Sequence, residues 1–276
     1  MSNVRFTDYI SKEEGLSLDF ENVKLDIDVF SLSSSNKPFD VEKLALHLRQ
    51  QYATDELIKT KSSIIGVSEE EYVNVYLLPN PKGSAPSPST ASGEFGEIVC
   101  SDVLEKYYLY IVPRLKLMSK QSPSNSVLLT DILAYKNGIT PEQDVLCLAE
   151  VKTNLSGDIS STLAKAFEEV SKKGEKARDK VRIIKTIEMY MQNAAIVKDT
   201  VTEKKMERFA KKTESNYLIE YFACSVLQSN ERPEAKSFGI SLGDCNDGIK
   251  MFHVYGPDLK ELENNLFGWF KHDNRE

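Results

Sequence analysis

The feature that most constrains the fold of this chain is a nearly continuous apolar run, Val145–Val151 (VLCLAEV). The run has the length of a strand, and its lack of alternation is typical of a central strand that is buried on both faces. Helical periodicity precedes it at Gly93–Tyr110 and follows it at Ser161–Ser171. Because buried strands between helices are the pattern of a layered α/β protein, we expect a central mixed sheet flanked by helices.

The first eighty residues have a different pattern. Alternating apolar residues at Leu16–Phe30 predict a pair of strands, and Tyr72–Leu78 predicts another strand. Between them, Pro38–Tyr52 predicts a helix for which Asp40 can serve as the N-cap. The next segment, Pro79–Ser92, holds four prolines and many small polar residues, which predicts a flexible loop. We therefore divide the chain into an N-terminal α+β region that packs on the core (1–80), a flexible Pro/Ser-rich loop (81–92) and the core itself (93–276).

The second half of the chain continues the α/β pattern. Val127–Tyr135 is a strand candidate just before the central run, and Lys176–Lys212 predicts one or two long amphipathic helices. The remaining predicted elements are strands at Tyr217–Val226, Phe238–Leu242 and Ile249–Tyr255, and a last helix at Pro257–Phe270.

The composition excludes some classes of protein. The first ten residues lack the apolar segment of a secretion signal, and no run approaches the roughly 18 apolar residues of a membrane span. The four cysteines are far apart and form no CxxC pair, so we predict buried free thiols. These observations predict a cytoplasmic protein that does not contact a membrane. The cysteines are Cys100, Cys147, Cys224 and Cys245.

Charge is distributed unevenly along the chain. The net charge is −7, yet Lys165–Lys212 contains 14 Lys and Arg residues against 8 Asp and Glu residues. A basic stretch on an acidic protein can be a surface that faces phosphate groups. It can equally be a solvated helix face with paired charges four residues apart, and the sequence leaves both interpretations open.

The sharpest chemical signal is Glu150-Val151-Lys152, at the end of the apolar run. Side chains alternate along a strand, so Glu150 and Lys152 share one face. Charges at the exit of a buried strand are costly unless they are paired or used. A carboxylate can hold a divalent metal and a lysine can contact phosphate oxygens, which suits phosphodiester hydrolysis. The same spacing at Glu203–Lys205 and Glu234–Lys236 follows no hydrophobic strand.

Upstream acids extend this signal. Asp131 lies in the predicted strand before Glu150, and a hairpin of the two strands would bring both carboxylates to one metal ion. Carboxylate oxygens are the ligands that Mg²⁺ and Mn²⁺ prefer. Glu94 and Glu97 share one face at the start of a predicted helix, and either could complete the site. We favour Glu97, which lies deeper in the helix, although acids at a helix start also complement its dipole.

Glu97, Asp131 and Glu150-x-Lys152 resemble, in order and context, the PD-(D/E)xK nuclease superfamily, whose fold is restriction-endonuclease-like. More narrowly, the GEFGE helix start, the segment at residues 129–134 and the LAEVKT strand resemble the HamA family. This resemblance implies the nuclease subunit of the Hachiman anti-phage defence system, restrained by a helicase partner (HamB). Thr130 departs from the family pattern, in which Gly precedes the metal-binding Asp. Asp144 is the nearest alternative ligand.

Our hypothesis is a metal-dependent DNA nuclease. Asp131, Glu150 and the Val151 carbonyl would hold Mg²⁺ or Mn²⁺, and Glu97 would support a second metal ion or the attacking water. Lys152 would stabilise the pentavalent transition state. The alternative is a catalytically silent DNA-binding or scaffold subunit of a defence complex.

Other enzyme classes find little support. The chain has no GxSxG motif, and its histidines (His47, His253 and His272) offer no convincing partner for a nucleophile. His47 is better explained as a structural or exposed residue than as a ligand, and His253 as a histidine of the core. A phosphate-binding GxxxxGK[ST] motif is absent from the sequence, so any ATP-driven step must belong to another chain.

Overall fold

The structure is a computed structural model. It describes residues 4–20, 23–35, 37–127, 129–156, 162–171, 179–211, 216–234, 238, 240 and 248–271.

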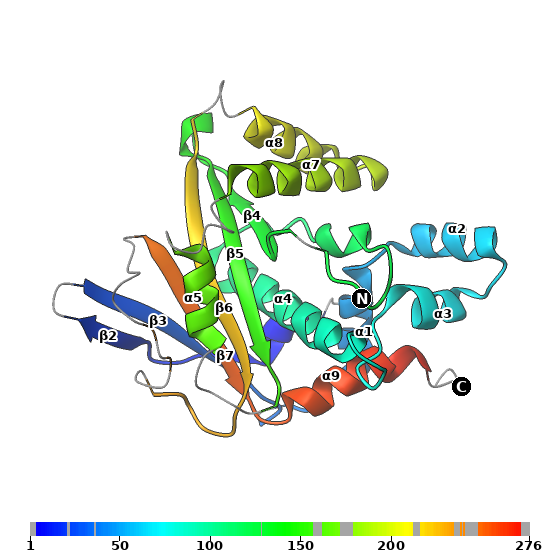
Figure 1. Ribbon diagram of the computed structural model, residues 1–276, viewed down its shortest axis with the longest axis horizontal. Helices are drawn as coiled ribbons and strands as arrows, with labels where there is room; N and C mark the ends of the chain where they lie inside the picture. Colours follow the sequence, from blue (N-terminus) through cyan, green and yellow to red (C-terminus); the bar gives the residue numbers. More distant parts are fainter. Residues whose placement is uncertain are drawn as a thin grey trace.

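One sheet organises these residues (Figure 1). Its strands follow the order β1-β3-β7-β6-β5-β4, and β2 also pairs with β3. β5, β6, β7 and β3 run parallel through the centre, while β4 is antiparallel to β5 at one edge. The expected fold class, an α/β protein with a central mixed sheet flanked by helices, is confirmed. The strands are β1 (Ile10–Lys12), β2 (Leu16–Phe20), β3 (Val23–Leu32), β4 (Ile132–Lys136), β5 (Val145–Asn154), β6 (Leu218–Gln228) and β7 (Ile249–Gly256).

The two faces of the sheet carry different helices (Figure 1). Successive residues of a strand point to opposite faces, so β5 contributes to both. Cys147, Ala149 and Val151 pack in the core beneath α4, whereas Leu146 and Leu148 pack beneath α7. We call these the α4 face and the α5 face. The α4 face carries α4 (Ser87–Tyr108) backed by α1 (Val41–Gln50) and α9 (Leu259–Gly268), and the α5 face carries α5 (Thr162–Val170), α7 (Lys180–Ile196) and α8 (Thr200–Ala210).

Short helical segments complete the described chain. They are η1 (Phe6–Asp8), α2 (Asp55–Ile65), α3 (Glu69–Glu71), η2 (Tyr72–Leu77), η3 (Lys116–Ser119), η4 (Pro141–Gln143) and η7 (Trp269–Lys271).

The segment Tyr72–Leu78, predicted to be a strand, is helical instead. Tyr72–Leu77 forms the π-helical segment η2. Tyr72, Val73 and Leu77 are buried while Val75 and Tyr76 are exposed, which is the spacing of one helical face. A short run of aromatic and β-branched residues favours a strand by propensity, and here tertiary packing decides otherwise.

The predicted flexible loop is shorter than expected. Helix α4 begins at Ser87, so residues 87–92 belong to the helix. Pro86 is its N-cap and Pro88 lies in the first turn, where the N–H that proline lacks would have no helical partner. The strands of the N-terminal region extend the same sheet as the core, because β3 pairs in parallel with β7.

Most other predicted elements are confirmed. The alternating Leu16–Phe30 segment forms the antiparallel pair β2 and β3. Asp40 caps α1 and accepts a hydrogen bond of 3.1 Å from Lys43 N. In the described part of the predicted helical segment Lys176–Lys212, the helices are α7 and α8, and the last predicted helix is α9. The strand expected at Phe238–Leu242 falls largely outside the described residues.

Cys100, Cys147 and Cys224 are buried free thiols, as predicted, and Cys245 lies outside the described residues. In the described part of the chain, no helix combines the length and the apolar character that crossing a membrane requires.

Candidate active site

The β4–β5 hairpin brings Asp131 next to Glu150 and Val151. β4 pairs with β5 so that Ile132 lies opposite Ala149. Asp131 directly precedes β4, and its Oδ2 atom accepts a hydrogen bond of 2.9 Å from Val151 N. The predicted hairpin is confirmed. Asp131, however, lies just before the strand rather than inside it, because pairing with β5 begins at Ile132.

Glu150 and Lys152 lie within β5, not at its end, because the strand continues to Asn154. Since Val151 packs in the core of the α4 face, its two neighbours point to the α5 face. The shared face that the spacing predicted is therefore confirmed.

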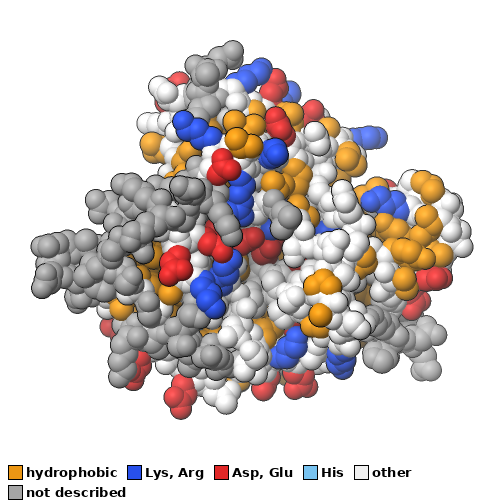
Figure 2. All heavy atoms as spheres, in the orientation of Figure 1, with side chains coloured by type: hydrophobic (Ala, Val, Ile, Leu, Met, Phe, Trp, Pro, Cys, Tyr) orange, Lys and Arg blue, Asp and Glu red, His pale blue; other side chains and the backbone are white. Residues whose placement is uncertain are grey.

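Helices α5 and α7 supply counter-charges to this pair. Glu150 Oε1 lies 3.0 Å from Arg182 Nη2, and Lys152 Nζ lies 2.9 Å from Glu169 Oε1. Arg182 Nη2 also donates a hydrogen bond of 2.6 Å to the carbonyl oxygen of Leu129, next to the start of β4. Figure 2 shows acidic and basic side chains interleaved on this side of the molecule, between α7 and α5.

Glu97 approaches from α4, on the other face. Its Oε1 atom lies 2.8 Å from Lys116 Nζ, and the same Nζ atom lies 3.3 Å from Asp131 Oδ1. Lys116 belongs to η3 and is only 5% exposed. One buried ammonium group therefore bridges two of the predicted site residues. No local pattern in the sequence marks Lys116 for this position.

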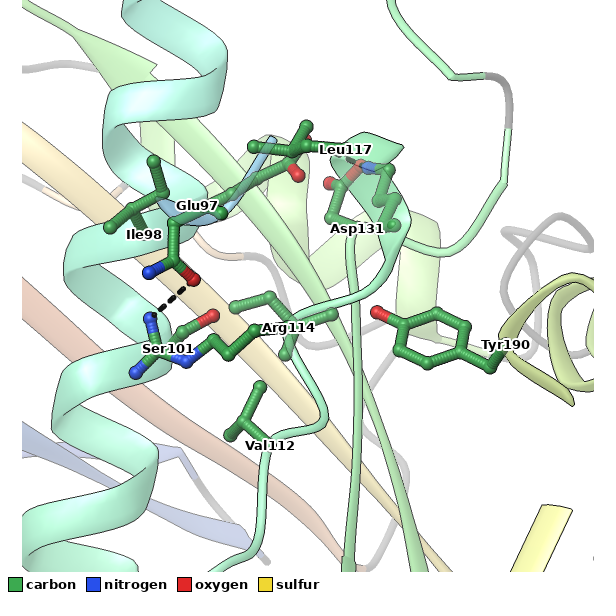
Figure 3. Close-up of a pocket in the computed structure, with 11 residues that line it drawn as sticks. Glu97, Ile98, Ser101, Val112, Arg114, Leu117, Asp131 and Tyr190 are labelled. Carbon is green, nitrogen blue, oxygen red and sulfur yellow. Dashed lines mark hydrogen bonds and ion pairs between the residues drawn. The ribbon is translucent and has the colours of Figure 1, made fainter. Parts of the chain in front are cut away.

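A cavity of about 30 Å³ lies beside the bridge. Figure 3 shows Glu97 on α4 and Asp131 at the start of β4, with the Tyr190 hydroxyl pointing toward the cavity from α7. A cavity of this size holds about one water molecule. Its polar lining residues are Gln51, Glu97, Ser101, Arg114, Lys116, Asp131 and Tyr190.

The three carboxyl groups differ in their pKa values. Burial and the Asp131 charge raise the pKa of Glu97 to about 8, against the opposing effect of Lys116. Burial and Asp131 likewise raise the pKa of Glu150 to about 9, against Arg182. Burial also acts on Asp131, but Lys116 and the Val151 N–H group outweigh it and lower the pKa of that carboxyl. Asp131 therefore carries the negative charge near neutral pH.

These side chains fit a divalent metal ion in chemical type. Asp131 is close enough to Glu97 and Glu150 to raise the pKa of both. Glu150 Oε1 is buried and accepts no hydrogen bond of good geometry, so it keeps a lone pair for a ligand. Within the described residues, however, no three Asp, Glu, His or Cys side chains are arranged closely enough to hold a metal ion. Lys116 lies between two of the three carboxyls.

The two alternative acids take part in other contacts. Glu94 is buried, accepts a 2.6 Å hydrogen bond from the Tyr52 hydroxyl and lies 2.6 Å from Lys120 Nζ. Asp144 lies 2.7 Å from Lys205 Nζ and also pairs with Arg208. Both acids therefore have cationic partners of their own, and Asp144 lies in the hairpin loop, at the opposite end of the β4–β5 pair from Asp131.

The sequence signals for the remaining contacts were partial. Arg182 lies in the basic stretch, and Glu169 lies in the helix that follows the strand of Glu150 and Lys152. The sequence could not distinguish either residue, as a partner of the site, from its charged neighbours. The basic stretch thus turns Arg182 and Lys205 inward as counter-ions. Lysines on the same two helices and on the turn between them remain exposed, namely Lys180, Lys185, Lys198 and Lys204.

The described histidines are structural, as predicted. His47 is buried and its Nε2 atom lies 3.1 Å from both oxygens of Asp102. His253 is buried, its Nδ1 atom lies 2.7 Å from Ser225 Oγ, and burial lowers its pKa to about 3. A histidine that stays neutral inside the sheet core is unsuited to activating a nucleophile.

The fold and this cluster define an α/β protein with carboxylates and a lysine gathered on an antiparallel hairpin at the edge of a mixed sheet. The family model of HamA matches residues 6–267, so the chain belongs to the HamA family. No curated protein matches the chain. Membership of this family confirms the resemblance seen in the sequence and fits a subunit of the Hachiman defence system.

Proposed function

We propose that this chain is a Mg²⁺- or Mn²⁺-dependent DNA nuclease that acts in anti-phage defence and is held in check by a helicase partner. The observation that carries the proposal is the meeting of Asp131, Glu150 and Lys152 on one hairpin of a HamA-family chain. An acidic pair beside a lysine suits phosphodiester hydrolysis better than any other chemistry available to these side chains.

Each residue has a distinct role in this proposal. Asp131, Glu150 and the Val151 carbonyl would hold the metal ion, with Glu97 supporting a second ion or orienting the water. When bound, the ion supplies an activated water and neutralises charge on the phosphate. The Val151 N–H group holds Asp131 in place through its 2.9 Å hydrogen bond, so the carboxylate is oriented before any ligand arrives.

Lys152 is the residue that would contact the phosphate. Its side chain is 30% exposed and its partner Glu169 is 28% exposed. Ion pairs with this much access to water contribute little to stability, about 1 kcal/mol or less. A phosphate group can therefore replace Glu169 as the partner of Lys152 at small cost. The exposed lysines of α7 and α8 would attract the DNA backbone to the same side of the sheet.

The ion pairs of the site suit an enzyme that is kept inactive. Glu97 and Asp131 share Lys116, Glu150 faces Arg182, and Lys152 faces Glu169. The same pairs would also stabilise a silent DNA-binding subunit. This second candidate function predicts binding without cleavage, so one assay separates the two.

The assay is cleavage of supercoiled plasmid in Mg²⁺ or Mn²⁺, alone and with the helicase partner. We expect nicking or degradation that EDTA abolishes and that Lys152→Ala reduces by a factor on the order of 100. Lys250→Ala is the matched control, because Lys250 is a lysine on β7 that pairs with Glu220, outside the site. Equal cleavage by wild type and Lys152→Ala would refute the proposed site. Metal-independent binding without cleavage, even with the partner present, would support the silent subunit.

A further inference from the structure

We infer that Lys116 is a built-in counter-ion of the metal site, whose ammonium group takes the place of a cation between Glu97 and Asp131 and must move aside when a divalent ion binds. The inference rests on the proposed function, because it concerns the same carboxyls. The inference assigns to Lys116, a residue outside the β4–β5 hairpin, control over the affinity of the site for metal ions.

The position of Lys116 carries this inference. Its Nζ atom is within 2.8 Å of Glu97 Oε1 and 3.3 Å of Asp131 Oδ1, and its side chain is 6% exposed. A buried ammonium group is stable only when carboxylates compensate it. Here these are Asp131, a proposed metal ligand, and Glu97, which supports a second ion or the water in the proposed function. The lysine and a metal ion would therefore compete for the same oxygen atoms.

Lys120 provides an internal comparison. It is also a buried lysine, with a side chain 3% exposed, and its Nζ atom contacts Glu94 Oε1 and the Pro123 carbonyl oxygen at 2.6 and 2.8 Å. Its partners are one carboxylate outside the hairpin and one backbone oxygen. Neither is a proposed metal ligand, so a structural role is enough to explain Lys120. Lys116, in contrast, contacts Glu97 on α4 and Asp131 just before β4, and both residues have a role in the proposed metal-dependent reaction.

The surroundings allow the Lys116 side chain to move while its backbone stays. Asn193 Nδ2 donates hydrogen bonds of 2.8 Å to the Leu115 carbonyl oxygen and 2.7 Å to Ser119 Oγ, which anchors η3 to α7 on both sides of Lys116. The adjacent cavity of about 30 Å³ matches an ammonium group in size, which is close to that of water. Gln51, Ser101 and Tyr190 line it, and side chains of these types have oxygen atoms that can accept hydrogen bonds from the displaced group.

The test is calorimetric titration of the purified full chain with Mn²⁺. Lys116→Met keeps the length of the side chain and removes its charge, so we expect Mn²⁺ to bind about tenfold tighter or more. Lys120→Met, the matched control, should leave the affinity within about twofold of wild type, and Asp131→Asn should abolish binding. Unchanged or weaker binding by Lys116→Met, with binding still lost in Asp131→Asn, would overturn the inference and leave the metal site intact. Failure of every protein to bind Mn²⁺ would instead overturn the proposed function.

A second measurement on the wild-type protein covers the case in which Lys116→Met does not fold. NMR of lysine side-chain ammonium groups should show a protected Lys116 signal in EDTA, assigned by its loss in Lys116→Arg. Saturating Mg²⁺ should shift that signal, because the displaced ammonium group exchanges Glu97 and Asp131 for new hydrogen-bond acceptors. A Lys116 signal that is unaltered while Mg²⁺ binds would overturn the inference.

Discussion

At the scale of single residues, the carboxyls of the candidate site divide into one that is ionised and two that hold protons. Asp131 has a lowered pKa, whereas the pKa of Glu97 is about 8 and that of Glu150 is about 9. Burial and the charge of Asp131 favour the protonated form of Glu97 and Glu150 at neutral pH, against the opposing effects of Lys116 and Arg182.

Metal binding should therefore strengthen as the pH rises from about 6 to about 9, because Glu97 and Glu150 must release protons to bind a cation. Titration calorimetry across this range, in buffers with different protonation enthalpies, measures both the affinity and the protons released. Without metal, the fold should lose stability over the same window, since the unfolded chain ionises first and binds fewer protons. A Mn²⁺ affinity that does not vary with pH would contradict the assigned pKa values.

The sequence predicted the charged residues that lie on regular elements but not their partners. Glu150 and Lys152 were identifiable because charged side chains on a buried apolar strand are costly unless they are paired or bind a ligand. Lys116 and Arg182 are brought in by tertiary packing from segments whose local patterns do not mark them, so only the structure places them beside the site.

At the scale of elements, the contact between α4 and β5 sets the position of Glu97 relative to the hairpin. Gly96 lies against Thr153, and a Cβ atom at residue 96 would overlap Thr153 Oγ1. Gly93, one turn earlier on the same helix, has open space around a Cβ atom. The helix therefore approaches the strand closely at Gly96, beside Glu97, and not at Gly93.

Gly96→Ala should destabilise the protein by about 1–3 kcal/mol, because the added methyl group forces α4 away from β5. Gly93→Ala should instead be neutral or stabilising by up to about 1 kcal/mol, since alanine favours a helix more than glycine does. Urea denaturation of both variants measures the difference. Destabilisation of equal size in the two variants would argue against the close approach.

Element boundaries show where sequence patterns fail. The strand at Val145–Val151 was predicted from its continuous apolar run, and the helical character of Lys176–Lys212 from its amphipathic period, which left open whether one or two helices form. The start of α4 at Ser87 was missed because prolines and serines suit both a loop and the first helical turn. The helical segment Tyr72–Leu77 was mistaken for a strand because its residue types favour strands while its burial pattern is helical.

At the scale of the whole molecule, a buried network around Asp102 joins the N-terminal region to the core. Asp102 is fully buried on α4 and accepts hydrogen bonds from Phe6 N at 2.9 Å and Arg114 Nη2 at 2.5 Å, with His47 Nε2 at 3.1 Å. Burial acts to raise its pKa, but Arg114 and His47 lower the pKa to about 2. Phe6 and His47 belong to the predicted N-terminal region, whereas Asp102 and Arg114 belong to the predicted core. One buried carboxylate therefore connects the two regions.

Asp102→Ala should destabilise the protein by about 2–3 kcal/mol, because it leaves the Phe6 N–H and the buried His47 ring without their acceptor and removes one of the two carboxylates that pair with Arg114. Denaturant unfolding measures the loss, with Asp26→Ala, an exposed acid on β3, as the control expected to stay within about 0.5 kcal/mol. In the wild type, this contribution is present above the ordinary pKa of about 3.8 and is lost as the pH falls through about 2. A loss no greater than that of the control would mean that the network does not join the two regions.

The central claim is that Asp131, Glu150 and Glu97 form one metal-binding site on the β4–β5 hairpin. Anomalous X-ray diffraction from crystals of the full chain soaked in Mn²⁺ tests it most directly, because the signal locates the ion without assumptions about activity. We expect a Mn²⁺ peak between Asp131 and Glu150, beside the Val151 carbonyl oxygen, with Lys116 withdrawn from the carboxylates. A peak elsewhere, or none while Lys116 still bridges Glu97 and Asp131 at saturating Mn²⁺, would show that these carboxyls do not form the metal site.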